Sequence, residues 1–322
     1  MPSDSQLPDA VRASTQHLIP VVPPYRLDLT ASVLRRLSTN VVDILTPEGE
    51  YVRAVAGSPN PVIVRARMSP RGESLAVTID GDSIPVSDVL ATVSRMLGVD
   101  RDITQFDESA TSIEWLAPLA DRMRGVKPPR YPTLWEGCAN SIVFQQVSLR
   151  AASTIMQRLI IALGESVRVP DIPTPLYAFP DSASFADAPD PLLRELGLSG
   201  AKIATLRRVG EALASGALDE AMLEERDSAD AAALLRKIKG IGPWTAAVIL
   251  LRGMGRLDVF PANDTSIASN LALVAGPAVF DPKAVLATLG PQRGMLYFYL
   301  LLARLESRDQ IGRASFDRVQ AT

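Results

Sequence analysis

The apolar pattern of this chain changes its period near Asp107, and this change constrains the fold more than any other feature. Before it, four segments alternate or cluster β-branched residues between turn-forming sequences: 25–30, 50–56, 61–68 and 74–80. Helical spacing of apolar residues predicts two helices beside these strands, over 31–38 and 86–97. The pattern indicates a small antiparallel α+β unit that ends near Gly98.

After Asp107 the sequence is typical of a helical domain. Apolar residues recur at helical intervals in eight segments joined by short Gly- or Pro-marked connectors: 113–124, 134–163, 192–197, 201–213, 231–238, 244–251, 266–274 and 295–305. A proline-rich interval over 169–191 is expected to be loop. The fold class is therefore α+β, in four parts: a flexible arm over 1–23, an α+β domain over 24–107, an all-helical domain over 108–307 and a tail over 308–322.

Composition excludes several kinds of site. The chain has 322 residues with 33 Lys and Arg against 36 Asp and Glu, so it is no simple polycation. Cys138 is the single cysteine and His17 the single histidine, which excludes an intrachain disulfide and disfavours a zinc site or a Ser-His-Asp triad. The sequence has no apolar stretch long enough to span a membrane and begins with polar, acidic residues, so we expect a soluble intracellular protein.

The segment 234–267 predicts a helix, a tight turn and a second helix. Gly240 and Gly242 in the turn allow positive φ and close backbone approach, and Pro243 suits the first position of a helix. Outward-facing amides there would form an anion site suited to a DNA phosphate. Five basic residues accompany it without an intervening acid: Arg236, Lys237, Lys239, Arg252 and Arg256. A plain helix–helix connection is the alternative, since a short Gly-x-Gly signal is common.

The runs IKGIGPWTAAVILLRG and DVFPANDTSI resemble the helix-hairpin-helix (HhH-GPD) DNA glycosylase superfamily, and closely its bacterial 3-methyladenine DNA glycosylase II branch. The segment 135–153, with Gln-Gln-Val-Ser, and the segment 192–213, with Leu-Gly-Leu-Ser, are similar to further motifs of that family. The N-terminal α+β unit also looks like the extra domain of that branch. The resemblance covers about residues 24–307.

This resemblance implies a monofunctional DNA glycosylase that flips a damaged nucleotide out of the duplex and hydrolyses the N-glycosidic bond of alkylated purines, as in base excision repair of 3-methyladenine. Asp264 matches the essential aspartate, which would stabilise positive charge on the sugar or orient water; it could also simply cap a helix. Gln146 matches the residue that fills the gap left by the flipped base, with an amide bound at a helix end as the alternative.

Trp244 stands where lyase-competent members of the superfamily have a lysine, so the resemblance implies no Schiff base and no lyase activity. Its indole could stack on a cationic alkylated purine with about 0.5–2 kcal/mol, or pack as a core tryptophan. Tyr297 is a second candidate for the base pocket. Val248 and Thr265 replace aromatic residues of the branch, so another lesion, such as hypoxanthine or an oxidised base, remains an alternative.

The resemblance also implies partners. Double-stranded DNA with damaged bases would contact Lys239, Gly240, Gly242, Thr245 and Gln146. No cofactor is required, but main-chain carbonyls could hold a structural Na⁺ or K⁺, by position those of Arg236, Ile238 and Ile241. We expect a monomer without membrane contact, in the bacterial cytoplasm and associated with the nucleoid. A non-catalytic helix-hairpin-helix DNA-binding protein is the alternative from another class.

Overall fold

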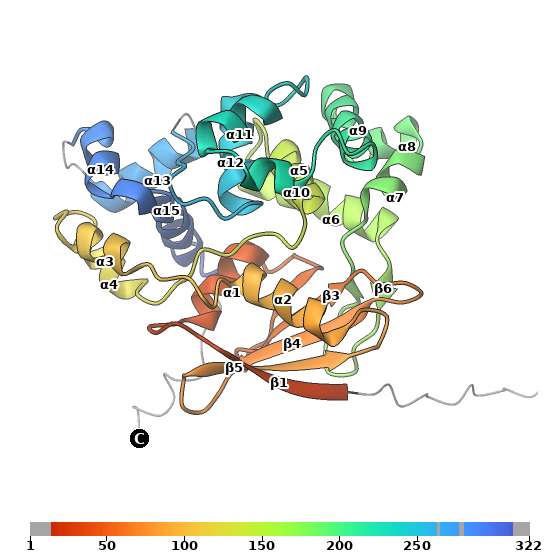
Figure 1. Cartoon of the computed structure of the whole chain (residues 1–322), viewed down its shortest axis with the longest axis horizontal. Helices are drawn as coiled ribbons and strands as arrows, with labels where there is room; N and C mark the ends of the chain where they lie inside the picture. Colours follow the sequence, from red (N-terminus) through yellow and green to blue (C-terminus); the bar gives the residue numbers. More distant parts are fainter. Residues whose placement is uncertain (1–13, 263–264, 277–279, 312–322) are drawn as a thin grey trace, which may run out of the picture.

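A five-stranded antiparallel sheet lies on one side of the protein and a layer of helices on the other (Figure 1). The structure is a computed structural model that describes residues 14–262, 265–276 and 280–311. Helix α1 (Leu27–Arg35) lies between the two layers and contacts both the sheet and the C-terminal helix α15 (Met295–Glu306). The arrangement confirms the predicted α+β fold class.

The sheet has the strand order β1-β5-β4-β3-β2, and all neighbouring strands are antiparallel. One face packs on α1 and α2 (Val86–Leu97), and the other packs on a short hairpin of strands β6 and β7. Because both faces are covered, Tyr51 and Val52 are both buried although they point to opposite faces. The strands are β1 (Ser14–Pro20), β2 (Asp43–Leu45), β3 (Tyr51–Val55), β4 (Val62–Met68), β5 (Ser74–Asp80), β6 (Ser166–Val167) and β7 (Leu176–Tyr177).

Strand β1 corrects the prediction of a flexible arm over 1–23 from residue 14 onward, and residues 1–13 of that arm lie outside the described residues. It pairs with β5 along its whole length, from Ser14 opposite Asp80 to Pro20 opposite Ser74. An edge strand needs few buried side chains, and of this one only Ile19 is buried. The polar composition that suggests an unstructured arm is therefore compatible with an edge strand.

Helix α1 corrects the prediction of a strand over 25–30 followed by a helix over 31–38. Its apolar residues form two rows on opposite sides of one helix. Leu27, Ala31 and Leu34 pack into the core beneath the sheet, whereas Leu29 and Val33 pack against α15. These two rows together produce the alternation that resembles a strand in the sequence.

The helical domain departs from the prediction in four respects. Helix α3 begins at Thr104 and packs on α4, so the predicted boundary at Asp107 falls inside a helix. The predicted segment 134–163 is two helices separated at residues 144–148, and the β6–β7 hairpin interrupts a domain that was expected to be all helical. The interval 169–191 also holds a short helix, Ser182–Asp187.

The remaining helices are α3 (Thr104–Thr111), α4 (Ala117–Arg122), α5 (Leu134–Val143), α6 (Leu149–Leu163), α7 (Ser182–Asp187), α8 (Asp190–Glu195), α9 (Gly200–Ala214), α10 (Glu220–Glu224), α11 (Ser228–Leu235), α12 (Pro243–Arg252), α13 (Thr265–Ala275) and α14 (Pro282–Thr288). One core lies among α5, α6, α9, α11 and α12, and a second joins α3, α4 and α15 to α1. Within the described ranges, none of the helices is long and apolar enough to cross a membrane.

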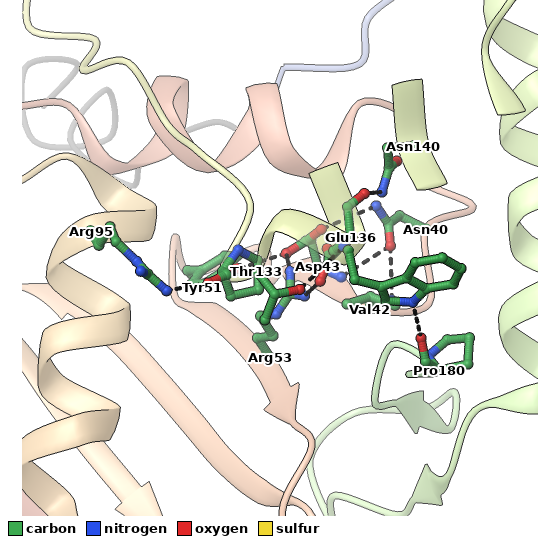
Figure 2. Close-up of polar contacts among 12 residues, drawn as sticks. Asn40, Val42, Asp43, Tyr51, Arg53, Arg95, Thr133, Glu136, Asn140 and Pro180 are labelled. Atoms are coloured by element: carbon green, nitrogen blue, oxygen red, sulfur yellow. Dashed lines mark hydrogen bonds and ion pairs between the residues drawn. The ribbon is translucent and has the colours of Figure 1, made fainter. Parts of the chain in front are cut away.

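A buried ion-pair network joins the sheet to the helical domain (Figure 2). Arg53 on β3, 2% exposed, donates to Asp43 at 2.7 Å and to Glu136 of α5 at 2.5 Å. The Tyr51 hydroxyl also donates to Asp43, at 2.6 Å. Burial raises the pKa of Glu136, and the Arg53 guanidinium partly offsets this effect. One guanidinium therefore compensates two carboxylates that come from different domains.

Replacing Arg53 with Met should lower the free energy of unfolding by about 3–5 kcal/mol, because it leaves two buried carboxylates unpaired. Urea denaturation monitored by circular dichroism measures the change. The matched control is Arg122→Met, which removes an exposed pair with Glu306 at 3.5 Å and should cost less than about 1 kcal/mol. An equal loss in the two variants would show that the buried network is not needed.

Candidate functional site

The helical hairpin forms as the sequence predicts, with α11 ending at Leu235 and α12 beginning at Pro243. Within the turn, the Ile241 amide donates to the Ile238 carbonyl at 3.0 Å. Gly240 has a φ of +106°, as predicted, whereas Gly242 has a φ of −88° and is the residue before the first helical turn of α12. Of the two glycines that allow positive φ, only Gly240 therefore adopts it.

The two glycines of the turn differ in what surrounds them. A Cβ atom on Gly240 would lie 2.0 Å from the Thr205 hydroxyl oxygen of α9, so this glycine permits close packing of the turn on that helix. A Cβ atom on Gly242 would meet no atom of the described chain within 4 Å. Gly240 thus serves the fold, whereas the space beside Gly242 is open to an external group.

Gln145 fixes the α5–α6 loop to the hairpin, a role that the sequence did not predict. Its side-chain amide donates to the Gly240 carbonyl at 3.1 Å and to the Thr245 hydroxyl at 2.7 Å. Thr245 is buried and its hydroxyl is bound by Gln145, so this hydroxyl holds the loop to the hairpin. The Gln-Gln pair is the sequence feature that could have indicated Gln145, but the family resemblance implies a role for Gln146 alone.

Gln146 lies at the exposed tip of this loop, with a φ of +54°. Val147 beside it is 38% exposed. Helix α6 is capped by the Ser148 hydroxyl, which accepts the Ala151 amide at 3.2 Å, and the described structure gives the Gln146 side chain no hydrogen bond. The described structure therefore shows Gln146 as an exposed residue of the loop and not as a cap of α6.

The five basic residues of the hairpin region divide into two groups. Arg236, Lys237 and Lys239 are exposed beside the turn. Arg252 is fully buried, donates to the Val33 carbonyl at 3.0 Å and lies over the Tyr131 ring at 4.8 Å.

The side chain of Arg256 is half-buried and is bound by other groups of the protein. Its guanidinium donates to the Leu223 and Arg226 carbonyls and to the Ser228 hydroxyl, where it joins α10 to α11. The prediction that Arg252 and Arg256 flank a DNA phosphate is therefore wrong. Arg252 follows Trp244 and Val248 at four-residue intervals, so it belongs to the inner face of α12.

A small pocket lies between the segment that follows α1 and the helices α5 and α6. Arg36 lines it, with 7% exposure and a φ of +58°, and its guanidinium carbon lies 3.9 Å from the centre of the Phe144 ring. Burial lowers the pKa of Arg36, against the effect of the nearby Tyr131 hydroxyl. No sequence pattern indicates a role for this residue, because an Arg-Arg pair at a helix end usually faces solvent.

The structure describes the two predicted base-pocket residues but not the predicted catalytic aspartate. Trp244 and Tyr297 are half-buried, and the phenol of Tyr297 affects the pKa of both Arg36 and Tyr131. The following aromatic residues of α15, Phe298 and Tyr299, are buried in the core. Asp264 lies outside the described residues, and so does its neighbour Asn263; helix α13 begins at Thr265.

Replacing Gly240 with Ala should lower the free energy of unfolding by at least about 2 kcal/mol, because the new methyl group would overlap Thr205 at a strained φ. Replacing Gly242 with Ala should change it by less than about 1 kcal/mol. Thermal unfolding of the two variants provides the comparison. Equal stability of the two variants would contradict the close packing of Gly240 on α9.

Comparisons with known proteins agree with this geometry. The model of the HhH-GPD superfamily base excision DNA repair protein matches residues 139–285, which include the α5–α6 loop and the hairpin. DNA-3-methyladenine glycosylase of Bacillus subtilis is 25% identical over 207 residues, which is 63% of this chain and 68% of that protein.

A Mycobacterium tuberculosis protein, described as a probable bifunctional transcriptional activator/DNA repair enzyme AlkA, is 31% identical over 180 residues, which is 55% of this chain and 34% of that protein. Among solved structures, a 3-methyladenine DNA-glycosylase from Archaeoglobus fulgidus has a TM-score of 0.75 and 23% identity, and the match covers 90% of this chain and 99% of that one. The similarity of fold therefore extends well beyond the family match, into the sheet domain.

Proposed function

Because this chain belongs to the HhH-GPD superfamily of base excision DNA repair proteins, we propose that it is a DNA glycosylase that removes alkylated purines, including those of the 3-methyladenine type, by hydrolysis. The observation that carries this proposal is the hairpin and the α5–α6 loop, held side by side by Gln145. The hairpin would bind the DNA backbone, and the loop would enter the duplex beside it.

The hairpin would bind a DNA phosphate through backbone amides. Gly242 leaves open space at the start of α12, where the first amides of the helix have no partners within the helix. Arg236, Lys237 and Lys239 surround this position with exposed positive charge. Such contacts position the duplex without selecting its sequence.

Asp264 is the carboxylate proposed to act on the sugar. As the N-glycosidic bond breaks, positive charge develops on C1′, and a nearby anion stabilises it or orients the attacking water. Trp244 is proposed to stack on the extruded base, with Tyr297 on another side of the pocket. Gln146 would fill the space left in the duplex.

A monovalent cation would fit the hairpin if main-chain carbonyls bind it. Of the three carbonyls proposed, that of Ile238 already accepts the Ile241 amide at 3.0 Å. The carbonyls of Arg236 and Ile241 accept no hydrogen bond from other groups of the described chain, which leaves both lone pairs for an ion. Bound there, the ion would supply positive charge next to the DNA backbone.

Replacing Asp264 with Asn should reduce base release from methylated duplex DNA by about 100-fold or more, because the developing charge loses its anion. Binding of the same duplex should stay within about threefold, since phosphate contacts dominate affinity. Chromatography of the bases released identifies the substrates, and a gel-shift assay measures binding. Unchanged base release would exclude Asp264 as the catalytic residue, and no release by the wild type would favour a DNA-binding protein without activity.

The wild-type protein should leave abasic sites without cutting the strand, because the indole of Trp244 cannot form a Schiff base. Incubation with a lesion duplex, with and without later alkali treatment, separates the two reactions on a denaturing gel. Trapping with borohydride should give no covalent adduct. Strand cutting that persists in a Lys239→Ala variant would point to another amine and contradict a purely hydrolytic reaction.

A further inference from the structure

Helix α9 carries a row of side chains that contacts both the α5–α6 loop region and the hairpin. Lys202, Thr205 and Arg208 follow one another at three-residue intervals, so they lie on one side of the helix. Lys202 donates to the Val143 carbonyl at the end of α5, at 2.7 Å, and Thr205 lies against Gly240 of the turn. The row holds α9 beside the hairpin, on the side of the protein away from the sheet (Figure 1).

Arg208 is the member of this row that keeps hydrogen-bond donors available. It is half-buried, and its Nη1 atom donates to the Lys239 carbonyl of the hairpin turn at 3.2 Å. Within the described chain it forms no ion pair, not even with Glu211, the single acid of α9. A guanidinium has five N–H donors, and none of the other nitrogens of Arg208 is enclosed without a partner. The remaining donors are therefore accessible to solvent.

The preceding residue, Arg207, carries the same charge, but its donors are used within the protein. It pairs with Asp190 at 2.7 Å and also donates to the carbonyls of Ala186 and Ala188, at 2.7 and 2.8 Å. One helix therefore presents two adjacent guanidinium groups, of which one is bound by α7 and α8 and the other is available beside the hairpin.

The hairpin supplies the positive surroundings that favour an anion at Arg208. Lys239, whose carbonyl Arg208 binds, is exposed, and so are Arg236 and Lys237. Open space lies beside Gly242, three residues after Lys239. A DNA strand carries one phosphate for about every 3.4 Å of its helix axis. A strand bound at the start of α12 would therefore bring a neighbouring phosphate close to these cations.

We infer that Arg208 binds a second DNA phosphate, next to the one held by the hairpin amides, so that the surface for the DNA backbone extends from the hairpin onto α9. The inference rests on the proposed function, because it takes the hairpin as the part that binds DNA. The bond to the Lys239 carbonyl fixes the guanidinium before DNA binds, which reduces the side-chain entropy lost in the complex. The planar guanidinium can direct two N–H groups at one phosphate.

Binding of an undamaged duplex over a range of salt concentrations tests this inference without requiring base release. Arg208→Gln keeps an amide donor for the Lys239 carbonyl but removes the charge. Its affinity should fall by about threefold to tenfold at low salt, and the slope of log K against log salt concentration should become shallower by about 0.9, the value for one phosphate contact. Arg208→Lys keeps the charge, so its slope should stay within about 0.3 of the wild-type slope.

The matched control is Arg207→Gln. It removes the same charge from the same helix, but Arg207 is bound to Asp190 and to two carbonyls, so the slope should change by less than about 0.3. Thermal unfolding verifies that each variant is folded. Arg208→Met provides a second neutral variant, which lacks the amide donor as well as the charge.

An unchanged slope in a folded neutral variant of Arg208 would overturn the inference. An equal change in Arg207→Gln would also overturn it, because the effect would then be one of overall charge. Failure of the wild type to bind the duplex would overturn both the inference and the proposed function. The expected slopes, in a protein that releases no alkylated base, would support the role of Arg208 and contradict the proposed glycosylase activity alone.

Discussion

The buried guanidinium of Arg53 is the contact on which the relation between the two domains depends. It compensates Asp43 of the sheet domain and Glu136 of α5, two carboxylates that could not remain charged inside the protein alone. Asp43 follows directly after the segment that leaves α1, so the same ion pair holds that segment against the helical domain. The position of Arg36 over Phe144 follows from this arrangement.

Much of the helical domain could be predicted from the sequence because its helices bury one apolar face each, and Gly and Pro mark their ends. The hairpin at Gly240 followed from the same signals. The sequence failed where tertiary packing overrides local pattern. Helix α1 is buried on two sides and resembles a strand, and strand β1 at the sheet edge resembles a polar arm. The burial of Arg252 could not be predicted for a different reason: a basic residue next to a DNA-binding motif can face either the DNA or the protein interior.

The most direct test of this account is a crystal structure of the Asp264→Asn variant bound to a duplex that contains an alkylated purine. We expect the extruded base to stack on Trp244 and the loop carrying Gln146 to occupy the gap that the base leaves in the duplex. A base seated away from Trp244, or a loop that stays outside the duplex, would contradict the account.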